Sequence, residues 1–247
     1  LQIIKGGSGE PLLILHDEIG HHEWLNYQQA LSQNHTLHIP SHPGFGKTQP
    51  LEWIMNMRDM AGWYLQALDE LKLGPINVVG FSMGGWLAAE MATMDPSMFK
   101  KIVLVGATGV KPPVGEIYDM FLEIAQNFIT AGFVDSSKVE EFQKICPDDA
   151  PAELVEAWEV AREEACRLGW KPYMYYAGLP QLLPRLKALP TLIVWGRQDA
   201  IVPISAGELY HQSIPGSKLT VLEDCGHRPE IEKTSDFVQL VNEFLNS

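Results

Sequence analysis

The chain has 247 residues, which fits one large domain or one domain with an insertion, and 46% hydrophobic residues are typical of a globular protein with a sizeable core. With 18 Lys and Arg against 31 Asp and Glu, the formal charge of −13 repels nucleic-acid phosphates and anionic lipid surfaces. The longest apolar runs fall far short of the roughly 20 residues that span a bilayer. We therefore expect a small-molecule substrate, neutral or weakly charged, and no nucleic-acid or membrane partner. Composition predicts no particular oligomeric state.

Three cysteines, Cys146, Cys166 and Cys225, bear on the cellular compartment. An odd number without the pair spacing of zinc sites suits free thiols in a reducing compartment better than a disulfide framework. No basic segment followed by an apolar stretch precedes the first expected strand, so a signal peptide is expected to be absent or already removed. The cytoplasm is the expected location.

The first 109 residues alternate between strand and helix signals. Residues 1–5 and 11–15 have strand character and flank a Gly-Gly-Ser-Gly turn, which predicts an opening β-hairpin. The pattern then predicts strands at 36–39, 76–80 and 101–107 and helices at 58–73 and 84–94. Such alternation predicts an α/β fold with a mostly parallel central sheet and helices on both faces.

The strand signal disappears between residue 110 and about residue 187. The spacing there predicts helices at 117–128, 138–145 and 152–168. Alternation then resumes, with expected strands at 191–195 and 218–222 and helices at 204–213 and 235–245. We therefore expect one α/β core in two parts, residues 1–109 and 188–247, with a helical lid inserted at 110–187.

A candidate nucleophile lies in Gly80-Phe81-Ser82-Met83-Gly84, which matches the pattern G-x-S-x-G. The motif falls between an expected strand and an expected helix, where a sharp turn exposes the serine hydroxyl and glycines allow close backbone approach. The alternative is a glycine-rich turn whose serine only caps the helix. The position between strand and helix favours Ser82 as a nucleophile.

A serine hydroxyl needs a base to accept its proton, and two of the eight histidines, His211 and His227, follow Ser82 in the chain. His211 falls inside an expected helix and is interpreted as a surface residue. His227 lies in a loop after the last expected strand, where an imidazole can reach the carboxyl edge of the sheet. We therefore expect His227 to be the general base.

The acid that orients the histidine is expected at Asp199, just after the strand at 191–195. The loop after the preceding strand, residues 108–111, contains no carboxylate. Glu223 and Asp224 are alternatives, but residues so close to His227 in sequence rarely align with its ring. A turn residue that bonds its own backbone is the other interpretation of Asp199.

An oxyanion hole needs two backbone N–H groups, one from the residue after the nucleophile and one from the loop after an early strand. Met83 is expected to supply the first and Glu18 the second. A carboxylate close to an oxyanion would oppose it, so the Glu18 side chain is expected to point away or to be paired.

Together these residues resemble the α/β-hydrolase superfamily across essentially the whole chain, and in particular its lidded esterase and carbon–carbon-bond hydrolase branch. The similarity includes Pro-Gly-Phe-Gly at 43–46, the acid-bearing strand and loop at 192–203, and the histidine loop at 225–230. It implies an α/β-hydrolase fold. It also implies a triad of Ser82, Asp199 and His227 and an oxyanion hole lined by Glu18 and Met83.

Asp17 departs from the family pattern, because members usually have glycine after the histidine that is His16 here. An aspartate can reach the required backbone geometry when its side chain bonds local N–H groups. We expect such support here, and we expect Asp17 to bond a donor group on the natural substrate.

Two further patterns are weighed and rejected. Gly-Phe-Gly-Lys-Thr at 44–48 ends like a phosphate-binding loop, but position 41 is serine where the first glycine would stand. The polar residues at 16–23 lack metal-site spacing and are interpreted as a polar entrance loop. No cofactor and no metal are therefore expected.

Aromatic residues gather in the expected lid, and Trp158, Trp170 and Tyr173 are candidates to contact substrate. With Tyr175 and Tyr176 they could equally form the core of the lid itself.

Three functions fit this sequence. The first is a carboxylesterase-like serine hydrolase that cleaves a small carboxylic ester through an acyl-enzyme on Ser82. The second is a carbon–carbon-bond hydrolase of a β-diketone-like acid, for whose carboxylate Arg162, Arg167 and Lys171 are the candidate cations. The third is a ligand-binding, receptor-like member with negligible turnover, which the departure at Asp17 supports.

Overall fold

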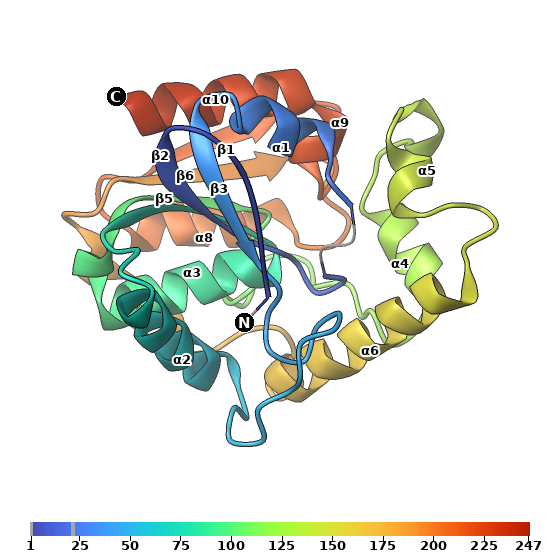
Figure 1. The fold of residues 1–247 in the computed structure, drawn as a ribbon, viewed down its shortest axis with the longest axis horizontal. Helices are drawn as coiled ribbons and strands as arrows, with labels where there is room; N and C mark the ends of the chain where they lie inside the picture. The colour runs from blue at the N-terminus through green and yellow to red at the C-terminus, as the bar shows by residue number, and fades with distance from the viewer. Residues whose placement is uncertain (1, 21–22) are drawn as a thin grey trace.

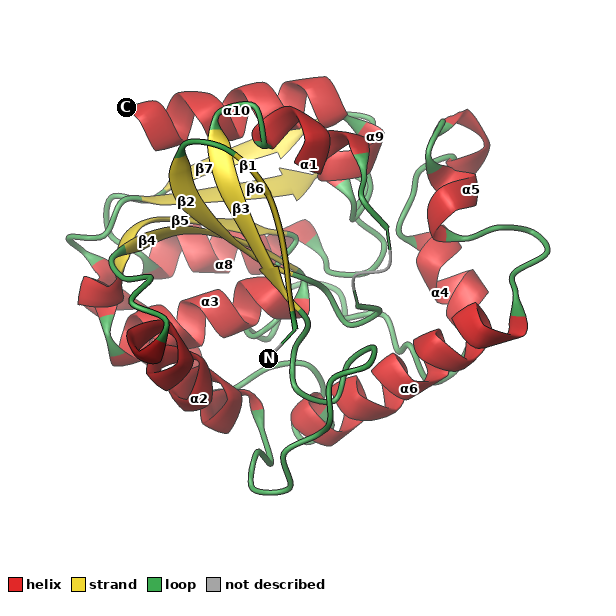
Figure 2. Ribbon diagram, in the orientation of Figure 1, coloured by secondary structure: helices red, strands yellow, loops and turns green. Residues whose placement is uncertain are grey.

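The computed structural model describes residues 2–20 and 23–247, and its centre is a 7-stranded sheet (Figures 1 and 2). The strand order is β1-β3-β2-β4-β5-β6-β7, and every neighbouring pair is parallel except β1 with β3. The strands are Ile3–Gly7 (β1), Glu10–Leu15 (β2), His35–Pro40 (β3), Ile76–Phe81 (β4), Phe99–Val105 (β5), Thr191–Gly196 (β6) and Lys218–Leu222 (β7). The predicted fold class is confirmed.

The predicted opening hairpin is wrong. β1 pairs antiparallel with β3, where Ile4 faces Ile39, and β2 lies between β3 and β4 and is parallel to both. The last four residues of β2 are buried and apolar, as expected of a strand covered on both faces, whereas β1 is partly exposed and suits an edge. Gly7 and Gly9, both with positive φ, let the chain turn between the two strands without pairing them.

Helices cover both faces of the sheet (Figures 1 and 2). One face holds α1 (Asn26–Leu31), α9 (Pro229–Glu232) and α10 (Thr234–Asn246), and the other holds α2 (Met57–Glu70), α3 (Met83–Met94) and α8 (Ile204–Ser213). α1 was not expected from the sequence, because its 6 residues are too few to show a helical repeat. No helix in the described residues is long and apolar enough to cross a bilayer.

Residues 110–187, called the lid segment below, hold helices and no strand. The helices are α4 (Ala125–Ala131), α5 (Phe142–Ile145), α6 (Ala152–Gly169) and α7 (Leu179–Leu182), with short 3-10 turns at Ser136–Lys138 and Leu183–Leu186. α4, α5 and α6 lie to one side of the sheet in Figure 1. The helix predicted at 138–145 is therefore shortened to its last turn, whereas the one predicted at 152–168 is confirmed.

The helix predicted at 117–128 is wrong over most of its length, and side chains from elsewhere in the lid segment explain why. The Tyr173 hydroxyl donates to the Tyr118 carbonyl and accepts from the Met120 N–H, both at 2.9 Å. Arg162 donates to the Met120 carbonyl at 2.5 Å. These bonds take backbone groups that an α-helix would pair with residues four positions away.

Several polar contacts dock the lid segment on the core, among them two near the starts of α1 and α2 and one from the His227 N–H to the Gly132 carbonyl at 2.7 Å. The Glu141 carboxylate accepts from the Asn26 N–H at the start of α1, at 3.0 and 3.1 Å. Arg167 on α6 donates to the Ile54 carbonyl in the turn before α2. The segment is thus fastened at several separate points to the core.

Candidate active site

Ser82 lies in the tight turn between β4 and α3, with φ 46° and ψ −113°. A non-glycine residue in such a conformation costs roughly 1–3 kcal/mol and persists only where its surroundings hold it. The Ser82 N–H donates to the Val105 carbonyl at 2.9 Å, and the Ser82 carbonyl accepts from the Thr108 N–H at 3.2 Å. A Cβ on Gly84 would collide with the Leu15 carbonyl, so the turn packs closely against the loop after β2. The turn has the strained geometry that the G-x-S-x-G pattern predicts.

His227 lies in the loop between β7 and α9, and its Nδ1 is 2.9 Å from Oδ2 of Asp199. Asp199 follows β6, and its Oδ1 accepts from the N–H groups of Ile201 at 2.9 Å and Val202 at 2.8 Å. Gly106, after β5, packs against the imidazole, where a Cβ would be 3.0 Å from the ring Cε1. The carboxylate is thus fixed by backbone donors and holds the ring through Nδ1, which leaves Nε2 as the nitrogen that can act as a base.

The other candidates for the acid and the base, Glu223, Asp224 and His211, are exposed at the surface. Glu223 is exposed and forms an ion pair with an arginine at 3.0 Å. Asp224 is exposed, and His211 is exposed on α8. Of the acids considered from the sequence, the structure brings Asp199 to His227.

The triad is enclosed in this conformation. Ser82 is 2% exposed and His227 is 5% exposed. Ser82 Oγ and His227 Nε2 are both buried, and neither has a hydrogen-bond partner within the described part of the chain. Burial lowers the pKa of His227, but the charge of Asp199, its hydrogen bond and the nearby Glu18 carboxyl outweigh this and raise the pKa above its ordinary value.

Asp17 organises the loop after β2. Its Oδ1 accepts from the Ile19 N–H at 2.9 Å, its carbonyl accepts from the Gly20 N–H at 3.3 Å, and its Oδ2 is 2.5 Å from Nη1 of Arg228. Burial raises the pKa of Asp17, but the charges of Arg228 and His16 and the Ile19 bond outweigh this and lower the pKa. The expected side-chain support of this loop is confirmed. Both carboxylate oxygens are engaged inside the protein, and contact of Asp17 with substrate stays a prediction.

The two expected oxyanion donors lie on either side of the elbow. Met83 is the first residue of α3, where an N–H has no acceptor within the helix. On the opposite loop, Asp17 takes the N–H groups of Ile19 and Gly20, which leaves Glu18 as the donor candidate. The oxyanion roles of Glu18 and Met83 stay predictions.

The expectation that the Glu18 side chain points away or is paired is wrong. Glu18 is 1% exposed, and within the described residues neither carboxyl oxygen has a hydrogen-bond partner of good geometry. Burial raises the pKa of this carboxyl and the charge of Asp17 adds to the effect, outweighing His227, Arg228 and the Ser82 hydroxyl, which lower it. The carboxyl therefore faces the triad. The residue pattern contains no signal for this, because side-chain direction in a loop depends on the tertiary fold.

Comparison with known proteins identifies a family with this architecture. The chain matches the alpha/beta hydrolase fold family over residues 3–131 and 151–234. It belongs to this family. The resemblance inferred from the sequence is thereby confirmed.

Individual relatives of this α/β hydrolase are distant in sequence. It is 27% identical, over 97% of its length, to a 2-hydroxymuconate semialdehyde hydrolase of Pseudomonas sp. (strain CF600), of which it covers 88%. It is 27% identical, over 98% of its length, to the dihydrolipoyllysine-residue acetyltransferase component of an acetoin cleaving system of Cupriavidus necator, and spans 65% of that relative. A solved structure of a mutant meta-cleavage product hydrolase has a TM-score of 0.79 at 25% identity, covering 99% of this chain and 93% of the other.

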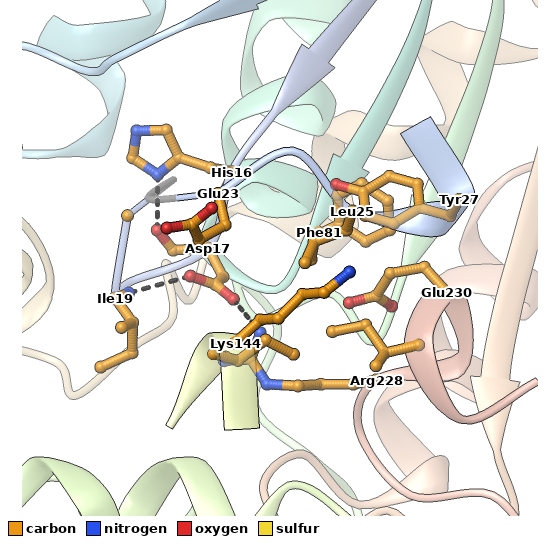
Figure 3. A pocket seen from close by; sticks show the side chains of 13 residues that line it. His16, Asp17, Ile19, Glu23, Leu25, Tyr27, Phe81, Lys144, Arg228 and Glu230 are labelled. Atoms are coloured by element: carbon orange, nitrogen blue, oxygen red, sulfur yellow. Dashed lines mark hydrogen bonds and ion pairs between the residues drawn. The ribbon is translucent and has the colours of Figure 1, made fainter. Parts of the chain in front are cut away.

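A pocket of about 60 Å³ is lined by Phe81 and Arg228, the chain neighbours of Ser82 and His227, among other residues (Figure 3). The Asp17–Arg228 ion pair forms part of its lining, and Lys144 reaches it from α5 in the lid segment (Figure 3). Burial raises the pKa of Glu230, which also lines the pocket, to about 7, although Arg228 acts in the opposite direction. Ser82, Asp199 and His227 do not line this pocket, so the cavity does not open onto the candidate nucleophile.

The three lid aromatics considered as substrate contacts lie in different settings. Trp158 is fully buried in α6, and Trp170 is 55% exposed with its ring against Phe121 and Tyr173. Tyr173 is partly buried, and burial raises the pKa of its hydroxyl, with smaller contributions in the same direction from the charges of Asp119 and Glu18. These contacts give each aromatic a role in lid packing, and direct contact with substrate stays a prediction.

The lid cations considered for a substrate carboxylate are engaged elsewhere. Arg162 pairs with Glu159 at 2.7 Å, and Arg167 pairs with Glu164 on the same helix. Lys171 is exposed. The structure places none of the three at the enclosed triad as an unpaired cation.

The polar loop after β2 is held in part by hydrogen bonds that reach the loop after β3 and α2. His16 Nε2 accepts from the His42 N–H at 3.0 Å, and His42 Nδ1 is 2.6 Å from the Tyr64 hydroxyl. Within residues 2–20 and 23–247, no three His, Cys, Asp or Glu side chains are arranged to hold a metal ion. His21 and His22, which belong to the same polar stretch of sequence, lie outside the described residues.

Proposed function

We propose that this α/β hydrolase cleaves a small, neutral or weakly charged carboxylic ester through an acyl-enzyme on Ser82. The observation that carries the proposal is the 2.9 Å contact between His227 Nδ1 and Asp199 Oδ2, in a chain whose Ser82 occupies a strained strand-to-helix turn. A buried carboxylate that accepts from Nδ1 fixes the tautomer in which Nε2 is the base. The arrangement supports activation of a serine nucleophile.

In the proposed reaction, Ser82 Oγ attacks the carbonyl carbon while His227 Nε2 takes the serine proton. His227 then gives this proton to the departing alkoxide, and an alcohol leaves the acyl-enzyme. A water molecule attacks the acyl group with His227 again as base, and release of the acid restores the serine. Asp199 stabilises the imidazolium at each step, and the N–H groups of Met83 and Glu18 are the proposed oxyanion donors.

A carbon–carbon-bond hydrolase is the second candidate, because a semialdehyde hydrolase and a meta-cleavage product hydrolase are among the similar proteins. The acid substrate considered for that reaction carries a carboxylate, and a buried carboxylate needs a cation or several donors. Arg228 is the cation at the triad, and it pairs with Asp17 at 2.5 Å. The paired state of this arginine favours the neutral ester.

The three free cysteines, two of them buried, support our proposal of a reducing, cytoplasmic location. The negative net charge supports the proposal that neither nucleic acid nor a membrane surface is a partner.

Labelling with a fluorophosphonate probe and hydrolysis of p-nitrophenyl acetate test the proposal. Wild type and a Ser235→Ala control, in which an exposed serine of α10 is changed, should be labelled and should turn over the ester. Ser82→Ala should do neither, with loss of activity on the order of 10⁴ to 10⁶. A labelled protein that cleaves a dienoate ketone acid faster than any ester would favour the second candidate, and an unlabelled protein without turnover would favour the receptor-like member.

A further inference from the structure

The Glu18 carboxyl is a buried polar group for which the triad mechanism has no use. Both of its oxygens are buried, and within the described residues neither makes a hydrogen bond of good geometry, although the Ser82 hydroxyl lies close enough to lower the pKa of the carboxyl. Buried carboxyl oxygens are almost always hydrogen-bonded in folded proteins, so a pair without partners calls for an explanation. A ligand atom inside the enclosed site would be such a partner.

Charged and titratable groups from four elements lie close enough to this carboxyl to interact with it electrostatically. Asp17 lies on the same loop, the Ser82 hydroxyl on the elbow, and His227 and Arg228 on the loop after β7. Tyr173 approaches from the lid segment. Arg228 is the one permanent cation in this set, and Asp17 already holds it in an ion pair at 2.5 Å.

An ionised carboxylate in this position would be buried without a dedicated cation. Removal of an unpaired charge from water is far more costly than removal of a neutral acid, so the neutral form is favoured. Burial, followed by the charge of Asp17, raises the pKa of Glu18 in the same direction. A neutral carboxylic acid carries an O–H, which can donate a hydrogen bond.

We propose that Glu18 is a catalytic residue whose neutral carboxylic acid donates a hydrogen bond to the oxyanion formed when Ser82 attacks the substrate carbonyl. The inference rests on the proposed ester hydrolysis and adds a third donor to the two backbone N–H groups. The proton stays on Glu18 throughout, and His227 alone transfers the serine proton. A neutral acid also removes the conflict between a negative side chain and a negative oxyanion.

The proposal makes the rate depend on two ionisations. His227 must be neutral to accept a proton, so the rate falls toward acid. Glu18 must be neutral to donate, so the rate also falls toward alkali, where its carboxylate would repel the oxyanion. The two groups interact, and the limbs of the resulting bell-shaped profile of kcat/KM therefore belong to the pair.

Two variants test whether Glu18 donates a hydrogen bond to the oxyanion or only has a structural role. Glu18→Gln keeps the shape and an N–H donor but cannot ionise, so kcat should stay within about tenfold of wild type and the alkaline limb should disappear. Glu18→Ala has no donor and should lose on the order of 10² to 10³ in kcat. Glu23→Gln, which changes an exposed acid of the same stretch, should keep the wild-type profile.

The proposal is overturned if Glu18→Ala retains kcat within tenfold of wild type, if Glu18→Gln is as slow as Glu18→Ala, or if the alkaline limb survives in Glu18→Gln. If a variant fails to fold, the test uses inhibition of the wild type by a trifluoromethyl ketone instead. This inhibitor forms an anionic adduct on the serine, and the adduct carries the oxyanion that Glu18 is proposed to bind. The affinity of the wild type for the inhibitor should fall as the pH rises and Glu18 ionises. An affinity that stays constant at alkaline pH contradicts the proposed role of Glu18. If Ser82 is labelled by the fluorophosphonate but the Glu18 variants keep the wild-type kcat and pH profile, this inference alone is refuted. If the wild type is neither labelled nor active on esters, the proposed function is refuted as well.

Discussion

The sheet edge that carries the triad and the lid segment above it are held by different kinds of interaction. β4 and β6 are buried along their whole length, and both pair with β5 through parallel backbone hydrogen bonds. The lid segment buries apolar side chains such as Trp158, but it contains no strand and is tied together in part by side-chain bonds to backbone groups, such as those of Arg162 and Tyr173. It also carries most of the large apolar residues that are exposed: Val114, Leu122, Ile124, Val134, Val155, Val160, Trp170 and Tyr176.

This difference separates two requirements of the proposed chemistry. Reacting atoms must be positioned to a fraction of an ångström, and buried strands with paired backbones provide this. Substrate must also reach an enclosed serine, and segments with fewer buried apolar contacts open at lower free energy. The following experiments test whether the two regions divide the work in this way.

The largest effect is expected from the sheet edge. Asp199→Asn leaves two backbone donors facing the side chain but removes the charge that orients and stabilises the imidazole, so kcat should fall by about 10⁴. Steady-state kinetics on p-nitrophenyl acetate measure this loss. Asp224→Asn is the matched control because Asp224 is exposed and lies near the same histidine in sequence. Equal losses in the two variants would reassign the acid.

The Asp17–Arg228 ion pair is expected to stabilise the catalytic side of the molecule. Asp17→Asn leaves Arg228 buried without its counter-charge, which should lower the free energy of unfolding by about 3 kcal/mol. Urea unfolding followed by tryptophan fluorescence measures the change. Arg228→Met in the same chain should restore part of the loss, since no unpaired charge then remains. A double variant less stable than both single variants would show that the ion pair is not the cause.

The lid segment should respond locally. Arg167→Ala removes the bond from α6 to the Ile54 carbonyl, so we expect amide exchange in α6 to accelerate by about tenfold while β4 is unchanged. Hydrogen exchange with mass spectrometry resolves the two elements. Lys171→Ala, at an exposed lid position, should alter neither. Faster exchange in β4 as well would mean that lid and sheet open as one unit.

The smallest effect concerns pH. The pKa of His227 is raised in the folded protein, so kcat/KM should be lost on acidification through a midpoint above about 6.5, the ordinary value for histidine. The sign follows from the requirement for a neutral base: protonation abolishes activity and deprotonation restores it. A rate profile on a p-nitrophenyl ester checks this, and a profile flat from about pH 5 to 9 is incompatible with a histidine base.

Short motifs at strand ends were enough to predict the positions of the three residues proposed as the triad. Ser82, Asp199 and His227 each follow a recognisable strand, and parallel strands bring their carboxyl ends to one edge. The place of β1 was not predictable in the same way, because its partner β3 is set by a long-range contact and not by the adjacent turn.

The remaining failures have a similar origin. The apolar spacing at 117–128 is compatible with a helix, but Tyr173 and Arg162, some 40 to 55 positions away, take the backbone groups that a helix would use. The direction of the Glu18 side chain likewise depends on how the loop after β2 packs against the elbow and the histidine loop. Local sequence contains neither kind of information.

Enclosure of Ser82 Oγ and His227 Nε2 has a consequence for selectivity. In the proposed reaction every ester must wait for the site to open, and a site that is open for about 1% of the time weakens the apparent affinity of all substrates about a hundredfold. This factor cancels between two esters of equal bulk but not between a small ester and a large one, because a larger ester needs a wider and rarer opening. Substrates would then be sorted by size before any bond is broken, and raising the solvent viscosity should slow the turnover of bulky esters more than that of small ones.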